Sequence, residues 1–366
     1  MKGQVKFRIY DKDNEYRFTL KRNITIIQGE SGTGKTTLLQ AMFNSMSGSS
    51  AAAYTVETSA NYFVYTRAFK KLRWETVLAE ITNSVIFIEE NNRFVYSNDF
   101  AKYVKKSGNY FVIIGRKPLK GLPYSWQEIY ELVSHKGSGD LRRIYEFKEF
   151  YTNFTFTDYN FDLVIMEDSN AGFEFFKNFF SNVPVISANG NGNVLNTILA
   201  ADASNILCIV DGAAFSSYLQ EYYDDFENGK HYNKRITIWP PESFEWVLLK
   251  AGVFTCKNLD KILENPSDYI ECCSYASWER FFTALAEESS EAQWKYNKNR
   301  LDDYYLTSGI KKKVNDVLPK ELQDLAKKKT NSGKTNNTAK MSLRKLTNSI
   351  GIKASGVFII ALQSEN

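Results

Sequence analysis

Apolar and polar residues alternate over three short segments at the start of the chain, Val5–Tyr10, Tyr16–Leu20 and Ile24–Gln28. A period of two residues predicts β-strands. The turn-forming residues of Asp11–Asn14 lie between the first two segments and predict a hairpin. The third segment runs directly into a glycine-rich stretch, and Thr37–Met46 then has the pattern of a helix. The chain therefore opens with a strand, a glycine-rich loop and a helix.

Predicted strands and helices continue to alternate along the first half. The strands are expected at 61–65, 85–88 and 110–114, and the helices near 74–81 and 100–106. This alternation is typical of a largely parallel, doubly wound α/β sheet. Residues 137–157 are charged and aromatic without a clear period, so we expect a domain boundary there.

A second α/β run follows this boundary. It has predicted strands at 163–166, 183–187, 206–210 and 235–239, with helices at 172–180, near 193–200 and from Ser243. Beyond Tyr269 the pattern is helical and polar, and 327–340 is of low complexity. The expected domains are 1–145, a Rossmann-like domain at 158–270, a helical region at 271–326, and a basic linker and tail at 327–366.

Composition agrees with a globular protein of this size. The 366 residues allow two or three domains, and the hydrophobic fraction of 43% suffices for cores. Aromatic residues make up 15% of the chain. They indicate sheet and core positions, and an aromatic surface that stacks nucleic-acid bases is the alternative.

The cysteines, the histidines and the hydropathy of the chain argue against several classes of protein. The four cysteines form no C-x-x-C pair and the two histidines are isolated, which argues against a zinc site and a disulfide framework. The first residues lack the apolar region of a signal peptide, and no apolar run reaches ~18 residues. We therefore expect a cytoplasmic protein without a membrane segment.

Charge is mildly positive, at +4, but it is unevenly distributed. Such a basic region is typical of a solvated helix face or tail, and nucleic-acid binding is the other interpretation. The basic residues concentrate towards the C-terminus, at Lys311, Lys312, Lys313, Lys320, Lys327, Lys328, Lys329, Lys334, Lys340, Arg344 and Lys345.

The glycine-rich stretch matches the phosphate-binding pattern G-x-x-x-x-G-K-[ST] in full. Its glycines let backbone N–H groups point at phosphate oxygens, beside the positive end of a helix. We expect Lys35 to reach the β- and γ-phosphates of ATP or GTP, and the Thr36 hydroxyl to bind Mg²⁺. The predicted nucleotide-binding residues are Gly29, Glu30, Ser31, Gly32, Thr33, Gly34, Lys35, Thr36 and Thr37.

Hydrolysis also needs a carboxylate near the metal, usually at the end of a neighbouring apolar strand. The apolar run 85–88 ends at Glu89 and Glu90. The pattern of phosphate-loop ATPases has Asp first and then a Glu that orients water, so Glu89 takes the place of the Asp as a metal ligand. Arg116 follows the next strand, where it could sense the γ-phosphate or remain a surface residue.

The opening hairpin and loop resemble those of ATP-binding-cassette and structural-maintenance-of-chromosomes ATPases. An L-S-G-G-Q signature and a coiled-coil arm, which those families have, are missing from this sequence. The resemblance implies ATP hydrolysis. It does not extend to dimerisation around ATP.

In the second half, acids and glycines follow successive predicted strands. Glu167 follows the first strand, Gly190 the second and Asp211 the third. Strand ends converge on one crevice of a parallel sheet, so these residues would share a site. Carboxylates without His or Cys suit Mg²⁺ or Mn²⁺. The alternative is an inert domain in which these residues serve turns and caps.

This order of residues resembles the Toprim domain of topoisomerases, primases and overcoming-lysogenization-defect (OLD) nucleases. The resemblance covers roughly 161–249 and implies Glu167 and Asp211 as metal ligands. Ala213 occupies the place of a second Asp, for which Glu242 or Glu245 would substitute. It implies metal-dependent phosphodiester cleavage, in DNA processing or phage defence.

The sequence thus predicts an ATPase joined to a Toprim-like nuclease, with the basic tail holding nucleic acid. The alternative is a nucleotide-dependent switch or sensor whose second domain binds a protein partner without chemistry. A small-molecule kinase is a third interpretation, but no lid-like arginine cluster follows the loop. A homo-oligomer is compatible with each of these.

Overall fold

A computed structural model describes the chain in seven segments, 1–30, 32–49, 54–137, 142–151, 161–219, 234–323 and 358–361. The chain forms two compact units. The first comprises Met1–Thr152 and Asp260–Arg280, and the second comprises Asn153–Leu259 and Phe281–Asn366. No helix within the described segments has the length and apolarity needed to cross a membrane.

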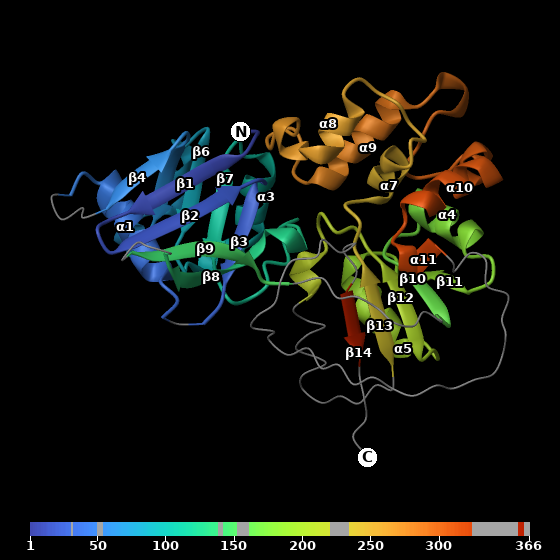
Figure 1. Cartoon of the computed structure of the whole chain (residues 1–366), viewed down its shortest axis with the longest axis horizontal. Coiled ribbons are helices and arrows are strands. Elements are labelled where there is room, and N and C mark those ends of the chain that lie inside the picture. Colours follow the sequence, from blue (N-terminus) through green and yellow to red (C-terminus); the bar gives the residue numbers. More distant parts are fainter. Residues whose placement is uncertain are drawn as a thin grey trace, which may run out of the picture. The chain divides into compact units, whose positions relative to one another are not determined.

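The first unit is built on a nine-stranded sheet, in which the strands lie in the order β4-β1-β2-β9-β8-β3-β7-β6-β5 (Figure 1). The strands are β1 (Val5–Tyr10), β2 (Asn14–Leu20), β3 (Ile24–Gln28), β4 (Thr55–Thr58), β5 (Asn61–Tyr65), β6 (Ser84–Ile88), β7 (Tyr110–Ile114), β8 (Ile129–Lys136) and β9 (Arg143–Glu149).

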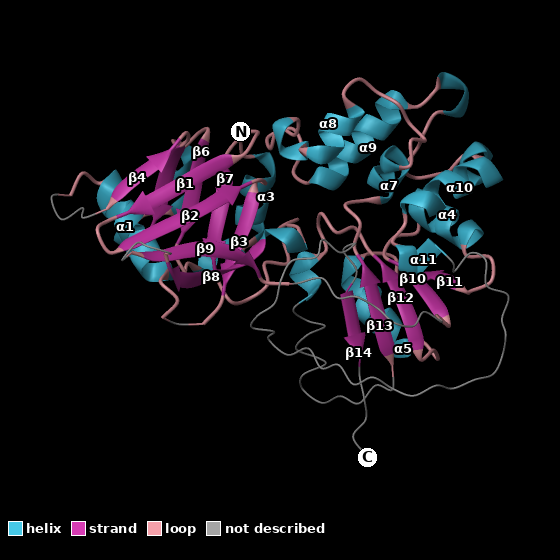
Figure 2. Ribbon diagram, viewed as in Figure 1, coloured by secondary structure: helices cyan, strands magenta, loops and turns pink. Residues whose placement is uncertain are grey.

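Helices cover both faces of this sheet (Figure 2). Side chains of α1 pack into one core cluster with β1 and β2, whereas side chains of α2 and α3 pack into a second cluster. Strand β6 contributes alternate residues to the two clusters, which explains its continuous apolar run. The helices of this unit are α1 (Lys35–Met46), α2 (Trp74–Ala79), α3 (Asn98–Lys106) and α8 (Leu259–Glu264), with 3-10 helices at Arg67–Phe69, Arg93–Tyr96, Trp126–Glu128 and Pro266–Asp268.

The sheet is mixed, and five of its eight strand pairings are parallel. The five strands from β8 to β5 pair in parallel, with β3 between β7 and β8. On the other side β1 pairs antiparallel with both β2 and β4, and β8 pairs antiparallel with β9. The predicted hairpin of β1 and β2 is confirmed.

Strand β9 lies within the stretch that the sequence suggested as a boundary. Its inward-facing aromatic rings attach it to β2, since Tyr145 stacks on Tyr16 with ring centroids 4.5 Å apart and Phe147 stacks on Phe18 at 4.3 Å. Charged residues occupy its exposed face, so the sequence resembles a polar linker. Stacking across strands is what incorporates this segment into the sheet.

A distant segment, Asp260–Arg280, completes the first unit. The guanidinium of Arg22 lies 3.4 Å from the centroid of the Trp278 ring, and the side-chain amide of Asn23 donates to the carbonyl of Ala276 at 3.1 Å. The expected boundary at residue 270 falls inside this segment. Cys272 of the segment lies in the same core cluster as residues of β1, β2 and α1. The domain limits expected from the sequence stay a prediction.

The second unit contains a smaller sheet in the order β11-β10-β12-β13-β14. The first four strands are parallel, and β14 pairs antiparallel with β13. Strand β14 lies within the expected tail, whose other residues, at 327–357 and 362–366, are outside the described segments. The strands are β10 (Leu163–Met166), β11 (Val185–Ser187), β12 (Asn205–Ile209), β13 (Arg235–Trp239) and β14 (Phe358–Ala361).

Phenylalanine side chains pack α4 onto this smaller sheet. Phe176 contacts Trp239 of β13 edge-on, and Phe175 contacts Phe244. The helices of the second unit are α4 (Ala171–Phe179), α5 (Val194–Ala200), α7 (Phe244–Lys250), α9 (Trp278–Ser289, which begins in the first unit), α10 (Ser308–Val317) and α11 (Lys320–Gln323), with 3-10 helices at Asn191–Asn193, Ala292–Trp294 and Asp303–Leu306.

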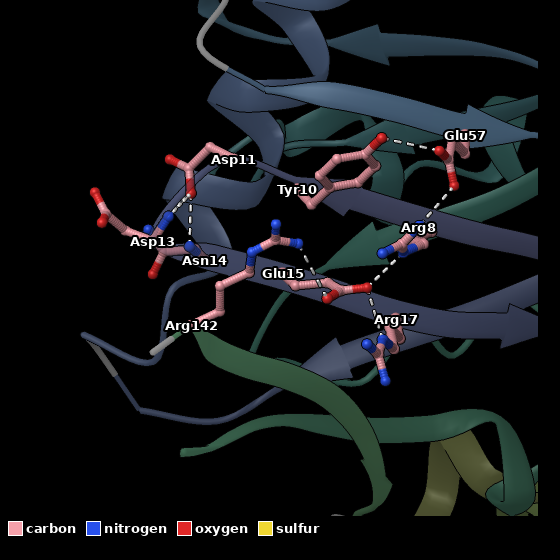
Figure 3. A network of polar contacts seen from close by, with 9 residues as sticks. All are labelled: Arg8, Tyr10, Asp11, Asp13, Asn14, Glu15, Arg17, Glu57 and Arg142. Atoms are coloured by element: carbon pink, nitrogen blue, oxygen red, sulfur yellow. Dashed lines mark hydrogen bonds and ion pairs between the residues drawn. The ribbon is translucent and has the colours of Figure 1, made fainter. Parts of the chain in front are cut away.

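A buried carboxylate organises the outer face of β1 and β2 (Figure 3). The side chain of Glu15 is 1% exposed and accepts from the Nε atoms of Arg8 and Arg17, and Arg142 approaches it to 3.8 Å. The hydrogen bonds from these guanidiniums, that of Arg17 first, lower the pKa of Glu15 to about 2. Because Arg8 and Arg17 lie directly opposite each other, Glu15 offsets a cross-strand repulsion.

Substituting Glu15→Gln should destabilise the protein by about 2 kcal/mol at pH 7, since it removes a paired buried charge. The folded pKa lies below the value of 4.5 for an unperturbed Glu. The contribution is therefore complete above pH 4.5 and is lost as the pH falls towards 2. Urea unfolding of both proteins across this range measures it. A stability difference that stays constant with pH would contradict the assigned pKa.

Candidate nucleotide-binding site

The glycine-rich loop connects β3, in the parallel half of the first sheet, to α1. Three of its glycines have left-handed backbone angles, with φ of 116° at Gly29, 84° at Gly32 and 95° at Gly34. Side chains other than glycine rarely adopt these angles, so the sequence pattern follows from the curl of the backbone. Ser31 lies outside the described segments.

Gly34 is also restricted by the ring of Tyr145. A Cβ atom at this position would lie 2.9 Å from that ring, closer than real contacts allow. Tyr145 stacks on the buried Tyr16, so the ring is supported from behind. The β2–β9 pair therefore fixes the point at which the loop enters α1.

The Lys35 ammonium lies inside the loop. Its Nζ donates to the carbonyl oxygens of Gly29 at 3.0 Å and Glu30 at 2.7 Å, and to the Thr33 hydroxyl at 2.9 Å. Burial lowers the pKa of Lys35, and the carboxylate of Glu90 opposes this effect. A cation enclosed by the oxygens of its own loop is available to exchange them for phosphate oxygens.

The N-terminus of α1 faces the same place. Its N-cap residue, Gly34, has no side chain that could cap it, and its first turn contains no acidic residue. The first backbone N–H groups of a helix have no partner within the helix, and they carry its partial positive charge. Thr36 and Thr37 lie exposed in this first turn. The loop, the ammonium and the helix end fit a bound polyphosphate.

The two candidate acids after β6 point to different partners. Glu89 accepts from the backbone N–H of Arg67 at 3.1 Å, with the Arg67 guanidinium at 3.8 Å. Glu90 forms an ion pair with Arg116 at 3.2 Å. Glu90 and Arg116 both influence the pKa of Lys35, so they are the pair that reaches the loop electrostatically.

The strand order explains this placement. Strand β7 lies between β3 and β6, and both β6 and β7 run parallel to β3. Their C-terminal ends therefore reach the same edge of the sheet as the loop, and Glu90 and Arg116 follow these ends. Sequence reasoning also missed Arg67. It follows β5, and because β5 pairs in parallel with β6, the ends of these two strands place Arg67 next to Glu89. Tyr145 is also missing from the sequence prediction, because β9 was not recognised.

This geometry agrees with a comparison to known proteins. Residues 6–166 match a family model described as an AAA domain. The matched family is P-loop ATPase-like and related to structural-maintenance-of-chromosomes proteins, as the opening motif predicted. Such an AAA-type domain indicates a nucleotide-binding ATPase, which normally uses Mg²⁺. No curated protein and no solved structure matches the chain.

In the second unit, hydrogen bonds connect the segments that follow β10, β11 and β12. The backbone N–H of Asp211 donates to the Glu167 carboxylate at 2.8 Å, and the N–H of Gly190 donates to the Glu167 carbonyl at 2.6 Å. The chain passes from β10 to β11 on one side and then returns to β12 on the other. Glu167 and Asp211 thus lie at the topological switch point, where open α/β sheets bind ligands.

A cavity of about 20 Å³ adjoins this point, and Glu167, Asp168 and Asp211 line it together with apolar residues such as Phe176 and Phe244. Glu245 has another partner, since its buried carboxylate accepts from the hydroxyl of Tyr296 at 2.9 Å. Among the described residues, no three His, Cys, Asp or Glu side chains are arranged to hold a metal ion. The structure thus brings Glu167 and Asp211 together without adding Glu245 as a ligand.

The contact between Gly34 and Tyr145 predicts a specific defect. Gly34→Ala should lower stability by about 1–3 kcal/mol, through a left-handed φ and a clash with the ring. Magnesium-dependent protection by ATP against thermal unfolding should also be lost. Gly48→Ala is the control, because Gly48 also has a left-handed φ, of 62°, but faces open space. Equal losses of ATP protection in both variants would contradict a special role for Gly34.

Proposed function

We propose that the chain is a magnesium-dependent ATPase in which Glu90 orients the attacking water and Arg116 stabilises charge on the γ-phosphate. The observation that carries this proposal is the Glu90–Arg116 ion pair at 3.2 Å, which lies in the electrostatic environment of Lys35. A carboxylate and a cation beside the loop suit the two ends of an in-line phosphoryl transfer.

The other loop residues would serve binding. Lys35 would exchange the carbonyls of Gly29 and Glu30 for the β- and γ-phosphates, and the N-terminus of α1 would bind the anion through its N–H groups. Thr36 and Glu89 would hold Mg²⁺, which neutralises phosphate charge when bound. The contacts of Glu89 with Arg67 would also position the segment that follows β5.

Matched acid substitutions test this assignment. Glu90→Gln should retain ATP binding and lower the single-turnover hydrolysis rate by about 10²-fold or more, because the residue is placed as a general base. Glu89→Gln should instead raise the magnesium concentration needed for half-maximal rate. Rapid-quench assays over a magnesium series measure both. If Glu90→Gln hydrolyses ATP at the wild-type rate, the assignment is wrong.

A second candidate function concerns the second unit. We propose Glu167 and Asp211 as a metal-dependent phosphodiesterase site of the Toprim-like kind. Their position at the switch point supports it, together with a small cavity that holds about one water or ion and has three acids in a mostly apolar lining. The Glu167 carboxylate would have to release the Asp211 N–H to bind a metal. Phage defence, and the switch with a non-catalytic second domain, stay predictions.

A plasmid-cleavage assay with Mn²⁺ distinguishes the phosphodiesterase from a switch with a non-catalytic second domain. A nuclease should nick the plasmid, and Glu167→Gln or Asp211→Asn should each lower the rate by about 10²-fold. Asp202→Asn, at an exposed acid, is the charge-matched control and should cleave normally. Absence of wild-type cleavage, or cleavage that both site variants retain, would leave the second unit without this function and favour the switch.

A further inference from the structure

Tyr96 lies close to the candidate nucleotide site, in a position that the proposed ATPase mechanism does not use. It is the last residue of the 3-10 helix Arg93–Tyr96 and is 48% exposed. The helix itself is anchored, because Val95 is buried in a core cluster and Phe94 stacks on Trp74 with ring centroids 5.4 Å apart. Packed neighbours therefore hold this aromatic side chain at the surface.

The turn after β6 brings Tyr96 back towards the two candidate acids. Asn91 adopts a left-handed backbone with φ of 76°, and the side-chain amide of Asn92 donates to the carbonyl of Glu89 at 2.7 Å. The 3-10 helix follows this turn directly. As a result, the carboxylate of Glu90 lies close enough to the Tyr96 hydroxyl to raise its pKa.

The hydroxyl of Tyr96 lies beside the residue that follows β7. Its oxygen is 3.7 Å from the position that a Cβ atom would occupy at Gly115, the residue before Arg116. The backbone N–H of Gly115 donates to the carbonyl of Ile27 at 3.2 Å, which joins this end of β7 to β3 just before the glycine-rich loop. The hydroxyl is therefore at the edge of the sheet where the loop begins.

This hydroxyl is a neutral hydrogen-bond donor next to charged groups. Burial raises the pKa of Tyr96 and the charge of Glu90 raises it further, so the phenol stays protonated near neutral pH. Within the described segments, the hydroxyl has no hydrogen-bond partner. A phosphate beside Glu90 would meet a like charge, and an O–H group that donates to a phosphate oxygen would offset part of that repulsion.

We propose that the Tyr96 hydroxyl donates a hydrogen bond to the γ-phosphate and makes the site prefer a nucleoside triphosphate to a diphosphate. This inference rests on the proposed nucleotide-binding function. Lys35, inside the loop, would hold the β-phosphate of either nucleotide. Only a triphosphate has a further phosphate on the side of Glu90 and Arg116, where the Tyr96 hydroxyl lies.

Isothermal titration of the full chain with ADP and with a non-hydrolysable β,γ-imido analogue of ATP, each with magnesium, tests this inference. Tyr96→Phe keeps the ring and removes only the hydroxyl. It should raise the Kd of the ATP analogue by about tenfold or more, as for the loss of a hydrogen bond to a charged group, and change the Kd of ADP by less than about twofold. The thermal unfolding transition should stay as in the wild type.

Tyr103→Phe is the matched control, because the Tyr103 hydroxyl of α3 donates to the carbonyl of Leu78 in α2 at 2.9 Å. It should leave both Kd values unchanged. Equal effects of the two Phe variants on the ATP analogue, or an equal rise in Kd for ADP and the analogue in Tyr96→Phe, would overturn the role of Tyr96 alone. A wild-type chain that binds neither nucleotide would overturn the proposed function, and the role of Tyr96 with it.

Discussion

The first unit depends on one constraint, the left-handed backbone of the loop between β3 and α1. Three glycines permit this path, and the curl directs carbonyl oxygens inward, where they hold the Lys35 ammonium. The same curl places a glycine, Gly34, at the N-cap position of α1, where it has no side chain to offer. The cation and the open helix end both favour an anion at this point. The surrounding strands position the side chains that this anion would meet.

Successive side chains of β2 point to opposite faces of the sheet and have different roles there. Tyr16 points inward and supports the ring of Tyr145, which rests against Gly34 of the loop. Glu15 and Arg17, its neighbours in sequence, point to the opposite face, where the buried Glu15 carboxylate accepts from the Nε of Arg17. One strand thus contacts the glycine-rich loop through one face and holds a buried ion-pair network on the other.

Local patterns predicted the elements whose burial is visible in the sequence. The apolar run of β6 and the alternation of β1 and β2 are such cases. The contacts of Lys35 with the oxygens of its own loop were not part of the prediction, which assigned this side chain to phosphates. Strand β9 escaped prediction because its charged face masks the inward rings of Tyr145 and Phe147. The packing of Asp260–Arg280 on the first unit escaped as well, since an amphipathic pattern does not reveal which sheet covers it.

In the candidate sites too, local sequence patterns predicted some residues and long-range packing decided others. Strand-end convergence placed Glu167 beside Asp211, because parallel neighbours end at the same edge. The partner of Glu245 lies 51 residues away, and no local rule connects the two. The pairing of Glu90 with Arg116, and of Glu89 with Arg67, likewise depends on how separate strand ends face one another.

We propose that a nucleoside triphosphate binds where the loop oxygens now enclose Lys35. Isothermal titration of ATP with magnesium into the full chain tests it most directly. We expect a saturable heat with one site per chain in the wild type. This heat should be lost in Lys35→Ala, while the thermal unfolding transition is retained. No heat in the wild type, or the same heat in both proteins, would contradict it.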